Sequence, residues 1–176
     1  MRLFVAIDFE TRTKGELGEI RDALRERTQR GSFTRTENFH LTLVFLGEVP
    51  GDRVPDITRA MDNIKSIPFE LTMGGLGRFS RAGGDVWWIG VQKSPELGQL
   101  QSALSRALAA QGFEIEQRVY TPHLTLARQV VTAGEVDRAT REIVYRVAAM
   151  QLMCSERIDG ALVYTPIHET SFDIAE

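Results

Sequence analysis

The sequence has few of the residues on which several classes of protein depend. Its single cysteine, Cys154, cannot form an internal disulfide and does not favour a thiolate metal site. No apolar run approaches the roughly 20 residues that a membrane-spanning helix needs. A net charge of −3 argues against a protein that coats long nucleic acids by neutralising many phosphates. The composition is therefore typical of a small soluble protein that does not associate with membranes.

Length and hydrophobic content limit the domain organisation. A chain of 176 residues, 43% of them hydrophobic, can bury a substantial core but is short for two independent domains. We therefore expect residues 1–176 to form a single domain with two lobes. The N-terminal region carries Asp8, Glu10 and Arg12 where a signal peptide would need a long apolar stretch, which favours a cytoplasmic location.

The most informative feature is a repeated tetrapeptide, His-Leu-Thr-Leu, at residues 40–43 and 123–126. The two copies contain two of the three histidines in the chain. Because alternate side chains of a strand share a face, each copy would present histidine and threonine on one surface and two leucines to a core. A repeat of this length can arise by chance, and a single His-x-Thr pair on a strand is more often structural. Two such surfaces facing each other would form a symmetric acid–base site.

Strands are expected throughout both halves of the chain. Hydrophobic patterns and turn signals predict them over residues 3–8, 38–47, 69–76, 86–91, 121–128, 147–157 and 161–172. Residues 77–84 form the expected loop between two paired strands. The last two strands form an expected hairpin that turns near residues 159 and 160.

Four helices are expected between these strands. Apolar residues at helical spacing predict one of them between residues 54 and 64. The other three follow capping signals, which are Thr13 with Glu16, Ser94 followed by Pro95, and Thr132 with Glu135. The helix after Ser94 has leucines at core spacing and is expected to end near Gly112.

The flanks of the two tetrapeptides resemble the paired H-x-T-x signatures of the two-histidine phosphoesterase superfamily. Within it, the chain resembles the RNA 2′,3′-cyclic phosphodiesterases, also called LigT-like or 2′-5′ RNA ligase proteins. The order and spacing of the shared motifs are more specific than any one motif. They span nearly the whole chain and comprise residues 2–8, 37–40, 45–49, 68–71, 88–91 and 121–123, with Gly160, Tyr164 and Pro166.

The resemblance implies an α+β fold of two pseudo-symmetric lobes, each an antiparallel sheet backed by helices, with a central cleft that carries both H-x-T-x motifs. It also implies hydrolysis of RNA 2′,3′-cyclic phosphate ends to 2′-phosphomonoesters, with reverse 2′-5′ ligation that needs no ATP. His40 would donate a proton to the leaving 3′-oxygen and His123 would accept one from water. Thr42 and Thr125 would bind the phosphate.

The residues themselves suit this chemistry. Imidazole, with an unperturbed pKa of about 6.5, acts as a base in one protonation state and as an acid in the other. Threonine hydroxyls donate hydrogen bonds to phosphoryl oxygens without adding charge. Arg128 is a further phosphate ligand to consider, but strict alternation from His123 places it on the opposite face unless the strand bulges near Ala127.

Three other classes of function remain open at this point. The same residues would serve an enzyme for a small cyclic nucleotide or another cyclic phosphate, or a binding module for RNA ends without catalysis. A metallohydrolase is less favoured, because hydroxyls and leucines rather than carboxylates neighbour the motif histidines. We expect no metal, no cofactor and no obligatory protein partner. The expected ligand is an RNA or oligonucleotide end that carries a 2′,3′-cyclic phosphate.

Overall fold

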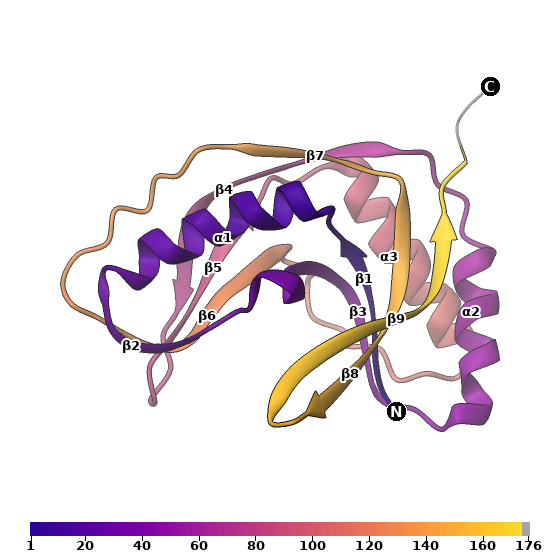
Figure 1. The fold of residues 1–176 in the computed structure, drawn as a ribbon. Coiled ribbons are helices and arrows are strands. Elements are labelled where there is room, and N and C mark those ends of the chain that lie inside the picture. The colour runs from indigo at the N-terminus through magenta and orange to yellow at the C-terminus, as the bar shows by residue number, and fades with distance from the viewer. Residues whose placement is uncertain (174–176) are drawn as a thin grey trace.

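Two antiparallel sheets and three α-helices make up the computed structural model, which describes residues 1–173 (Figure 1). The four-stranded sheet has the order β3 (His40–Glu48), β1 (Arg2–Asp8), β8 (Ala149–Ile158) and β9 (Ala161–Ser171). The five-stranded sheet has the order β2 (Thr28–Phe33), β6 (His123–Thr132), β5 (Asp85–Val91), β4 (Phe69–Phe79) and β7 (Ile143–Val147). The expected α+β class with two antiparallel sheets is confirmed.

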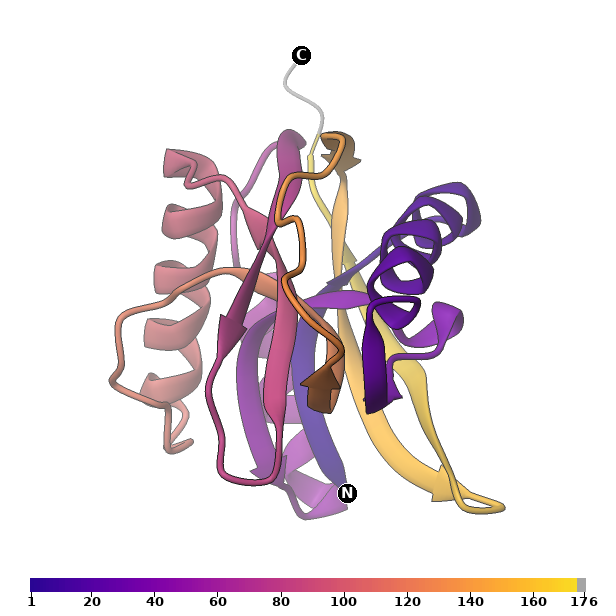
Figure 2. The ribbon, with the colours of Figure 1, turned by 90° about the vertical axis from the view of Figure 1, so that its left-hand side faces the viewer.

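Each sheet has its own helices. Helix α1 (Thr11–Arg25) contacts β2 and β7 of the five-stranded sheet. Helices α2 (Val54–Asp62) and α3 (Pro95–Ala110) contact each other and contact β9 and β3 of the four-stranded sheet. In Figure 2, α1 and α3 lie on opposite sides of the strands. We call these two units the five-stranded lobe and the four-stranded lobe. Within residues 1–173, no helix combines the length and the apolarity that a membrane crossing requires.

Leucines from both tetrapeptides enter the same hydrophobic core. Leu41, Leu43, Leu124 and Leu126 are each at most 2% exposed, and all four belong to one continuous cluster that draws on both lobes. The alternation read from the sequence is therefore confirmed in both motif strands. Burial of this size is worth about 1.5–3 kcal/mol per leucine, so the leucines hold the orientation of the strands strongly.

Helix α3 follows the sequence prediction closely. The Ser94 hydroxyl accepts a hydrogen bond from the Leu97 backbone N–H at 3.1 Å, and Pro95 occupies the first helical position. The four leucines at core spacing are all buried. The C-terminal hairpin of β8 and β9 is also confirmed, with its turn at residues 159 and 160.

Both Thr-x-x-Glu capping boxes are wrong. Helix α1 begins at Thr11, because the Lys14 N–H bonds to the carbonyl of Glu10 and closes the first turn there, so Thr13 lies inside the helix and is buried. Thr132 instead ends β6, where it pairs with Thr28, and residues 133–142 contain no helix. A short Thr-x-x-Glu pattern cannot reveal that a neighbouring strand already binds the segment.

Two strands were not expected from the sequence. Strand β2 is a polar edge strand with four exposed residues, and β7 pairs with β4 at the other edge of the same sheet. The expected loop over residues 77–84 is also too long, because β4 continues to Phe79 and β5 begins at Asp85. Gly77 consequently pairs with Trp88 inside the sheet.

The ring of Trp88 depends on the absence of a side chain at Gly77. A Cβ atom added to Gly77 would overlap this indole ring, whereas a Cβ atom added to Gly98, on the exposed face of α3, would meet nothing within 4 Å. We expect Gly77→Ala to lower the free energy of unfolding by about 1–3 kcal/mol through overpacking. The matched change Gly98→Ala should raise it by about 0.5–1 kcal/mol through helix propensity.

Urea denaturation followed by tryptophan fluorescence measures both changes. Equal stability of the two variants would mean that the indole does not lie over Gly77.

Candidate active site

The histidine and threonine of the first motif point away from the core. His40 pairs with Asp8 and Thr42 pairs with Ala6 across β1 and β3. Paired residues of neighbouring strands lie on the same face of a sheet, so Asp8 lies beside His40. The Lys14 ammonium binds the Asp8 carboxylate at 2.8 Å and brings a positive charge to the same region.

The second motif repeats this arrangement on the other sheet. His123 pairs with Gly90 and Thr125 pairs with Trp88 across β5 and β6. Trp88 is therefore on the same face as the second histidine, whereas its neighbour Trp87 is 2% exposed and belongs to the core. Because the two tryptophans are consecutive in a strand and lie on opposite faces, only Trp88 lies beside the motif.

Each of the two histidines makes the same kind of hydrogen bond to a backbone carbonyl. Nδ1 of His40 lies 2.7 Å from the carbonyl of Asn38, and Nδ1 of His123 lies 2.7 Å from the carbonyl of Thr121. A carbonyl oxygen only accepts hydrogen bonds, so each Nδ1 carries the hydrogen and each Nε2 is left for chemistry. Nε2 of His40 lies 3.0 Å from the hydroxyl of Thr42. Sequence reasoning did not identify these carbonyls, although both precede their histidine by two residues.

Burial sets the proton affinity of His40. Desolvation lowers the pKa of His40 below the usual 6.5, and the positive charges of Lys14 and Arg128 lower it further. The hydrogen bond to Asn38 and the negative charge of Asp8 act in the opposite direction without cancelling the effect. His40 therefore favours its neutral form more strongly than a free imidazole does.

A bulge places Arg128 on the face of the second motif. Trp88 pairs with Thr125 but Trp87 pairs with Ala127, so the register omits Leu126. Leu126 and Ala127 are consecutive and fully buried, which breaks the alternation of the strand. Arg128 is exposed, and its charge acts on His40 and on Tyr164 of the other lobe. The bulge near Ala127 that is needed to bring Arg128 to the face of His123 is thus present.

The first motif strand has the matching bulge. Val5 pairs with Val44 and Ala6 pairs with Thr42, so Leu43 is omitted from the register. Five residues after the histidine, Phe45 occupies the position that corresponds to Arg128 and is 47% exposed. The two lobes therefore share the backbone geometry of the motif but differ in the side chain that follows it.

Two reciprocal hydrogen bonds join the motif strands. The Thr34 hydroxyl donates to the carbonyl of Thr125 at 2.9 Å, and the Tyr120 hydroxyl donates to the carbonyl of Thr42 at 2.8 Å. Burial raises the pKa of Tyr120, so this phenol remains a donor at neutral pH. Each motif threonine is thus held through its backbone by a hydroxyl from the segment that precedes the other motif.

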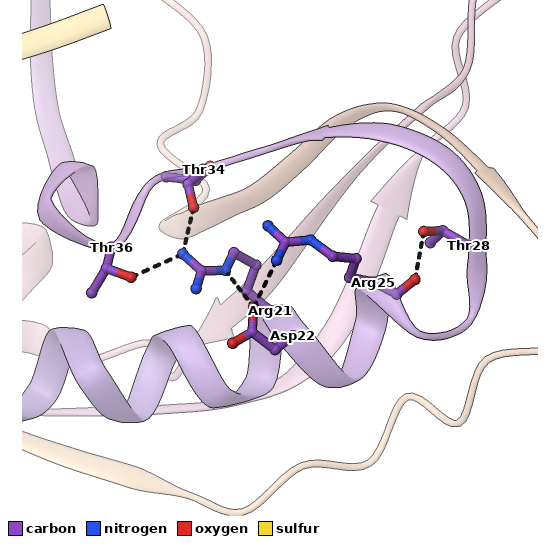
Figure 3. A network of polar contacts seen from close by, with 6 residues as sticks. All are labelled: Arg21, Asp22, Arg25, Thr28, Thr34 and Thr36. Carbon is purple, nitrogen blue, oxygen red and sulfur yellow. Dashed lines mark hydrogen bonds and ion pairs between the residues drawn. The ribbon is translucent and has the colours of Figure 1, made fainter. Parts of the chain in front are cut away.

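Arg21 supports the segment that provides one of these bonds. Its Nη1 donates to the carbonyl of Thr34 at 2.8 Å and to the hydroxyl of Thr36 at 3.0 Å, and its Nε donates to Asp22 (Figure 3). Arg21 lies in α1 and is 9% exposed, so a buried charge ties this helix to the chain before the first motif. A single arginine in a helical pattern carries no sequence signal for this role.

The third histidine lies outside this group. His168 on β9 has its Nε2 atom 2.8 Å from the Asp62 carboxylate at the end of α2. In the part of the chain that the structure describes, no three His, Cys, Asp or Glu side chains are grouped in a way that would hold a metal ion. Cys154 is buried in β8.

Comparison with known proteins identifies the family. The sequence model of the 2′-5′ RNA ligase superfamily matches residues 7–156. The chain belongs to this superfamily. An RNA 2′,3′-cyclic phosphodiesterase from Thermotoga maritima is 34% identical over 131 residues, which cover 73% of this chain and 70% of that protein. One from Escherichia coli K12 is 30% identical over 167 residues, which cover 94% and 93% of the two chains.

Solved structures of the superfamily agree with the fold. The crystal structure of E. coli LigT complexed with 3′-AMP is similar with a TM-score of 0.84 and 28% sequence identity, and the match covers 97% of each chain. The same protein complexed with phosphate gives a TM-score of 0.81 at 28% identity. The resemblance read from the sequence motifs is therefore confirmed at the level of family and fold.

The environment of His40 leads to a prediction about its titration. The imidazole of His40 should titrate below pH 6.5, and Arg128→Gln should raise its pKa because a positive charge is removed. Histidine Cε1–H NMR signals followed against pH measure both values, with Arg157→Gln at the C-terminal hairpin as the matched charge control. A wild-type pKa above 6.5, or no response to Arg128→Gln, would contradict this account of the site.

Proposed function

We propose that the protein hydrolyses RNA ends that carry a 2′,3′-cyclic phosphate to 2′-phosphomonoester ends, by acid–base catalysis that needs no metal. The observation that carries the proposal is the duplicated geometry of His40 and His123. Each imidazole has its Nδ1 hydrogen bonded to a backbone carbonyl, which leaves its Nε2 available. The relatives named RNA 2′,3′-cyclic phosphodiesterase and the LigT complexes with 3′-AMP and phosphate support the same activity.

The two imidazoles divide the proton transfers between them. His123 accepts a proton at Nε2 from the water that attacks phosphorus. His40 donates a proton from Nε2 to the 3′-oxygen as its bond to phosphorus breaks. An in-line displacement places the attacking and leaving oxygens on opposite sides of phosphorus, which requires an acid and a base that are separate groups. After the reaction His40 is neutral and His123 is protonated, and exchange with solvent restores both.

The lowered pKa of His40 is compatible with its role as the acid. A cyclic phosphodiester carries a negative charge, and an anion beside an imidazole favours its protonated form. Substrate binding thus raises the proton affinity of a group whose pKa is lowered in the free enzyme. The proton is then held weakly enough to be given up to the leaving oxygen.

The remaining site residues bind the phosphate. Thr42 and Thr125 share the faces of the two histidines and donate hydrogen bonds to its non-bridging oxygens. Arg128 follows the bulge of the second motif strand, and its positive charge stabilises the charge that develops on these oxygens. We place these residues in one central cleft of a single domain over residues 1–176, in a cytoplasmic enzyme.

The same site also supports a second reaction of the cyclic phosphate, the joining of two RNA strands. The hydroxyl at the 5′ end of a second RNA strand replaces water as the nucleophile, and a 2′-5′ linkage forms without ATP. The acid and the base keep their positions in this joining reaction. Water is far more concentrated than RNA ends, so hydrolysis is the dominant reaction.

An oligonucleotide that ends in a 2′,3′-cyclic phosphate tests the activity directly. Purified protein should convert it to a terminal phosphate that a general phosphatase removes and whose mass fits the addition of water. Resistance of this phosphate to a 3′-nucleotidase, which removes only 3′-phosphates, identifies it as a 2′-phosphate. A mononucleoside 2′,3′-cyclic phosphate, tested beside it, separates an RNA-end enzyme from one for small cyclic nucleotides. Binding of the oligonucleotide without turnover would mean that the protein is a binding module for RNA ends and not an enzyme.

Turnover should survive exhaustive chelation, because none of the proposed steps uses a metal. We expect rates with EDTA to stay within about twofold of those without it, well inside the 10²-fold or larger effect of losing a catalytic group. A loss of activity in EDTA that is reversed by zinc, manganese or magnesium would contradict the metal-independent mechanism with two histidines.

The pH dependence of kcat/KM separates the two histidines. His123→Ala should keep only the decline with rising pH, because protonated His40 is still required and its lowered pKa places that decline below pH 6.5. His40→Ala should lose this decline. Each variant should be about 10²–10⁴-fold slower than wild type. A decline of kcat/KM with rising pH that persists in His40→Ala would show that another group is the acid.

A further inference from the structure

Two partly exposed aromatic rings lie against the second motif histidine. The ring of His123 is 5.4 Å from that of Phe79 in an edge-to-face arrangement, and 5.9 Å from that of Trp88. The two aromatic rings are 5.4 Å apart, and the guanidinium of Arg81 lies 5.6 Å from the centre of the Phe79 ring. Neither hydrolysis nor the binding of a phosphate makes use of this group, which we call the Phe79 platform (Phe79, Arg81 and Trp88).

The register of the sheet brings the Phe79 platform to the face that carries His123. Trp88 is paired with Thr125 on one side and with Gly77 on the other. Phe79 lies two residues after Gly77, so it returns to the same face. Arg81 lies in the turn that follows β4, is exposed, and donates a hydrogen bond to the carbonyl of Ser80. The platform is thus built on paired strands beside the proposed base.

The aromatic rings beside His40 are arranged differently. Phe4 is 3% exposed and packs with Ala6, Met153 and Tyr164 in a small apolar cluster. Phe4 and Tyr164 are each 4.9 Å from the His40 ring, and of these two rings only that of Tyr164 is partly exposed. The platform beside His123 has instead an exposed arginine over an aromatic ring.

The chemistry of an in-line reaction assigns different ligands to these two sides. The 3′-oxygen leaves toward His40, so the ribose of the cyclic phosphate lies on the His40 side. The nucleophile approaches from the His123 side. During hydrolysis this nucleophile is water, which needs no aromatic platform. In the joining reaction it is a 5′-hydroxyl, and the nucleoside that carries this hydroxyl must lie beside His123.

We propose that Phe79, Arg81 and Trp88 form a subsite for the first nucleoside of an RNA strand with a free 5′-hydroxyl. The inference rests on the proposed function. The first base stacks on the rings, which accept any base, and Arg81 binds the phosphate that follows it. The 5′-oxygen forms its bond to phosphorus as the bond to the 3′-oxygen breaks. The hydroxyl proton passes to Nε2 of His123, and the 3′-oxygen takes the proton of His40.

Comparing hydrolysis with strand joining tests the subsite. A donor oligonucleotide ending in a 2′,3′-cyclic phosphate is incubated with wild type or Phe79→Ala, with and without a 5′-hydroxyl acceptor strand. Cleavage of a purified 2′-5′-linked product is measured as the reverse reaction. We expect Phe79→Ala to reduce joining and 2′-5′ cleavage by about 10-fold, the scale of one lost base stack, and to leave hydrolysis within about twofold.

An acceptor that lacks its first base identifies the group that is recognised. Wild type should join this abasic acceptor about 10-fold more slowly than the intact one, whereas Phe79→Ala should join both at the same rate, since it has already lost the stacking contact. Phe45→Ala is the matched control. Phe45 is an exposed phenylalanine on the His40 strand with the Arg2 guanidinium 5.0 Å from its ring centre, and the base dependence should persist in this variant.

The outcomes distinguish the subsite from the proposed function. Equal losses of hydrolysis and joining in Phe79→Ala would mean that the ring only supports His123 and would overturn the subsite. A wild type that hydrolyses the donor but joins no strand at saturating acceptor would also overturn it. Absence of hydrolysis in wild type would remove the proposed function itself. If Phe79→Ala does not fold, as judged by circular dichroism, the exposed Arg81→Ala is expected to show the same selective loss, and a lack of selectivity there counts equally against the subsite.

Discussion

The burial of Leu41, Leu43, Leu124 and Leu126 in one core is the constraint on which the rest of the site depends. Side chains alternate along a strand, so four leucines that point into the core force His40, Thr42, His123 and Thr125 to point away from it. Burying these leucines is worth several kcal/mol, and a slip of one residue would exchange the two sets of side chains. The faces that carry the motif histidines and threonines are therefore oriented by packing on the opposite side of each sheet.

Backbone hydrogen bonds complete what packing begins. The carbonyls of Asn38 and Thr121 select the same tautomer in both histidines, so the two imidazoles expose the same nitrogen. Thr34 and Tyr120 bind the backbone of the opposite motif and hold the two strands together. The symmetry then ends at the fifth residue after each histidine, where one motif has Phe45 and the other has Arg128. A duplicated scaffold thus carries two sides with different chemistry, as an in-line reaction requires.

Much of this arrangement was predictable from short-range patterns. The His-Leu-Thr-Leu repeats, the Ser94 cap and the leucines of α3 are local signals that the structure confirms, and the family motifs gave the class of fold. The Thr13 cap failed because the helix begins two residues earlier, at Thr11, and the Thr132 cap failed because Thr132 is paired with Thr28 in a strand. Strand β2 was missed because four of its six residues are exposed, which leaves no apolar alternation. The hydrogen bonds of Thr34, Tyr120 and Arg21 join residues that are distant in sequence or carry no motif, so only the tertiary structure reveals them.

His40 and His123 are proposed to have different roles, and a change of leaving group distinguishes the acid from the base. In catechol cyclic phosphate the leaving oxygen is a phenolate, which departs with far less need of an acid than a ribose oxygen does. Rates of wild type, His40→Ala and His123→Ala are measured with this substrate and with a nucleoside 2′,3′-cyclic phosphate. We expect the phenolic substrate to restore most of the activity lost in His40→Ala and little of that lost in His123→Ala. Preferential recovery of His123→Ala, or equal recovery of both variants, would contradict it.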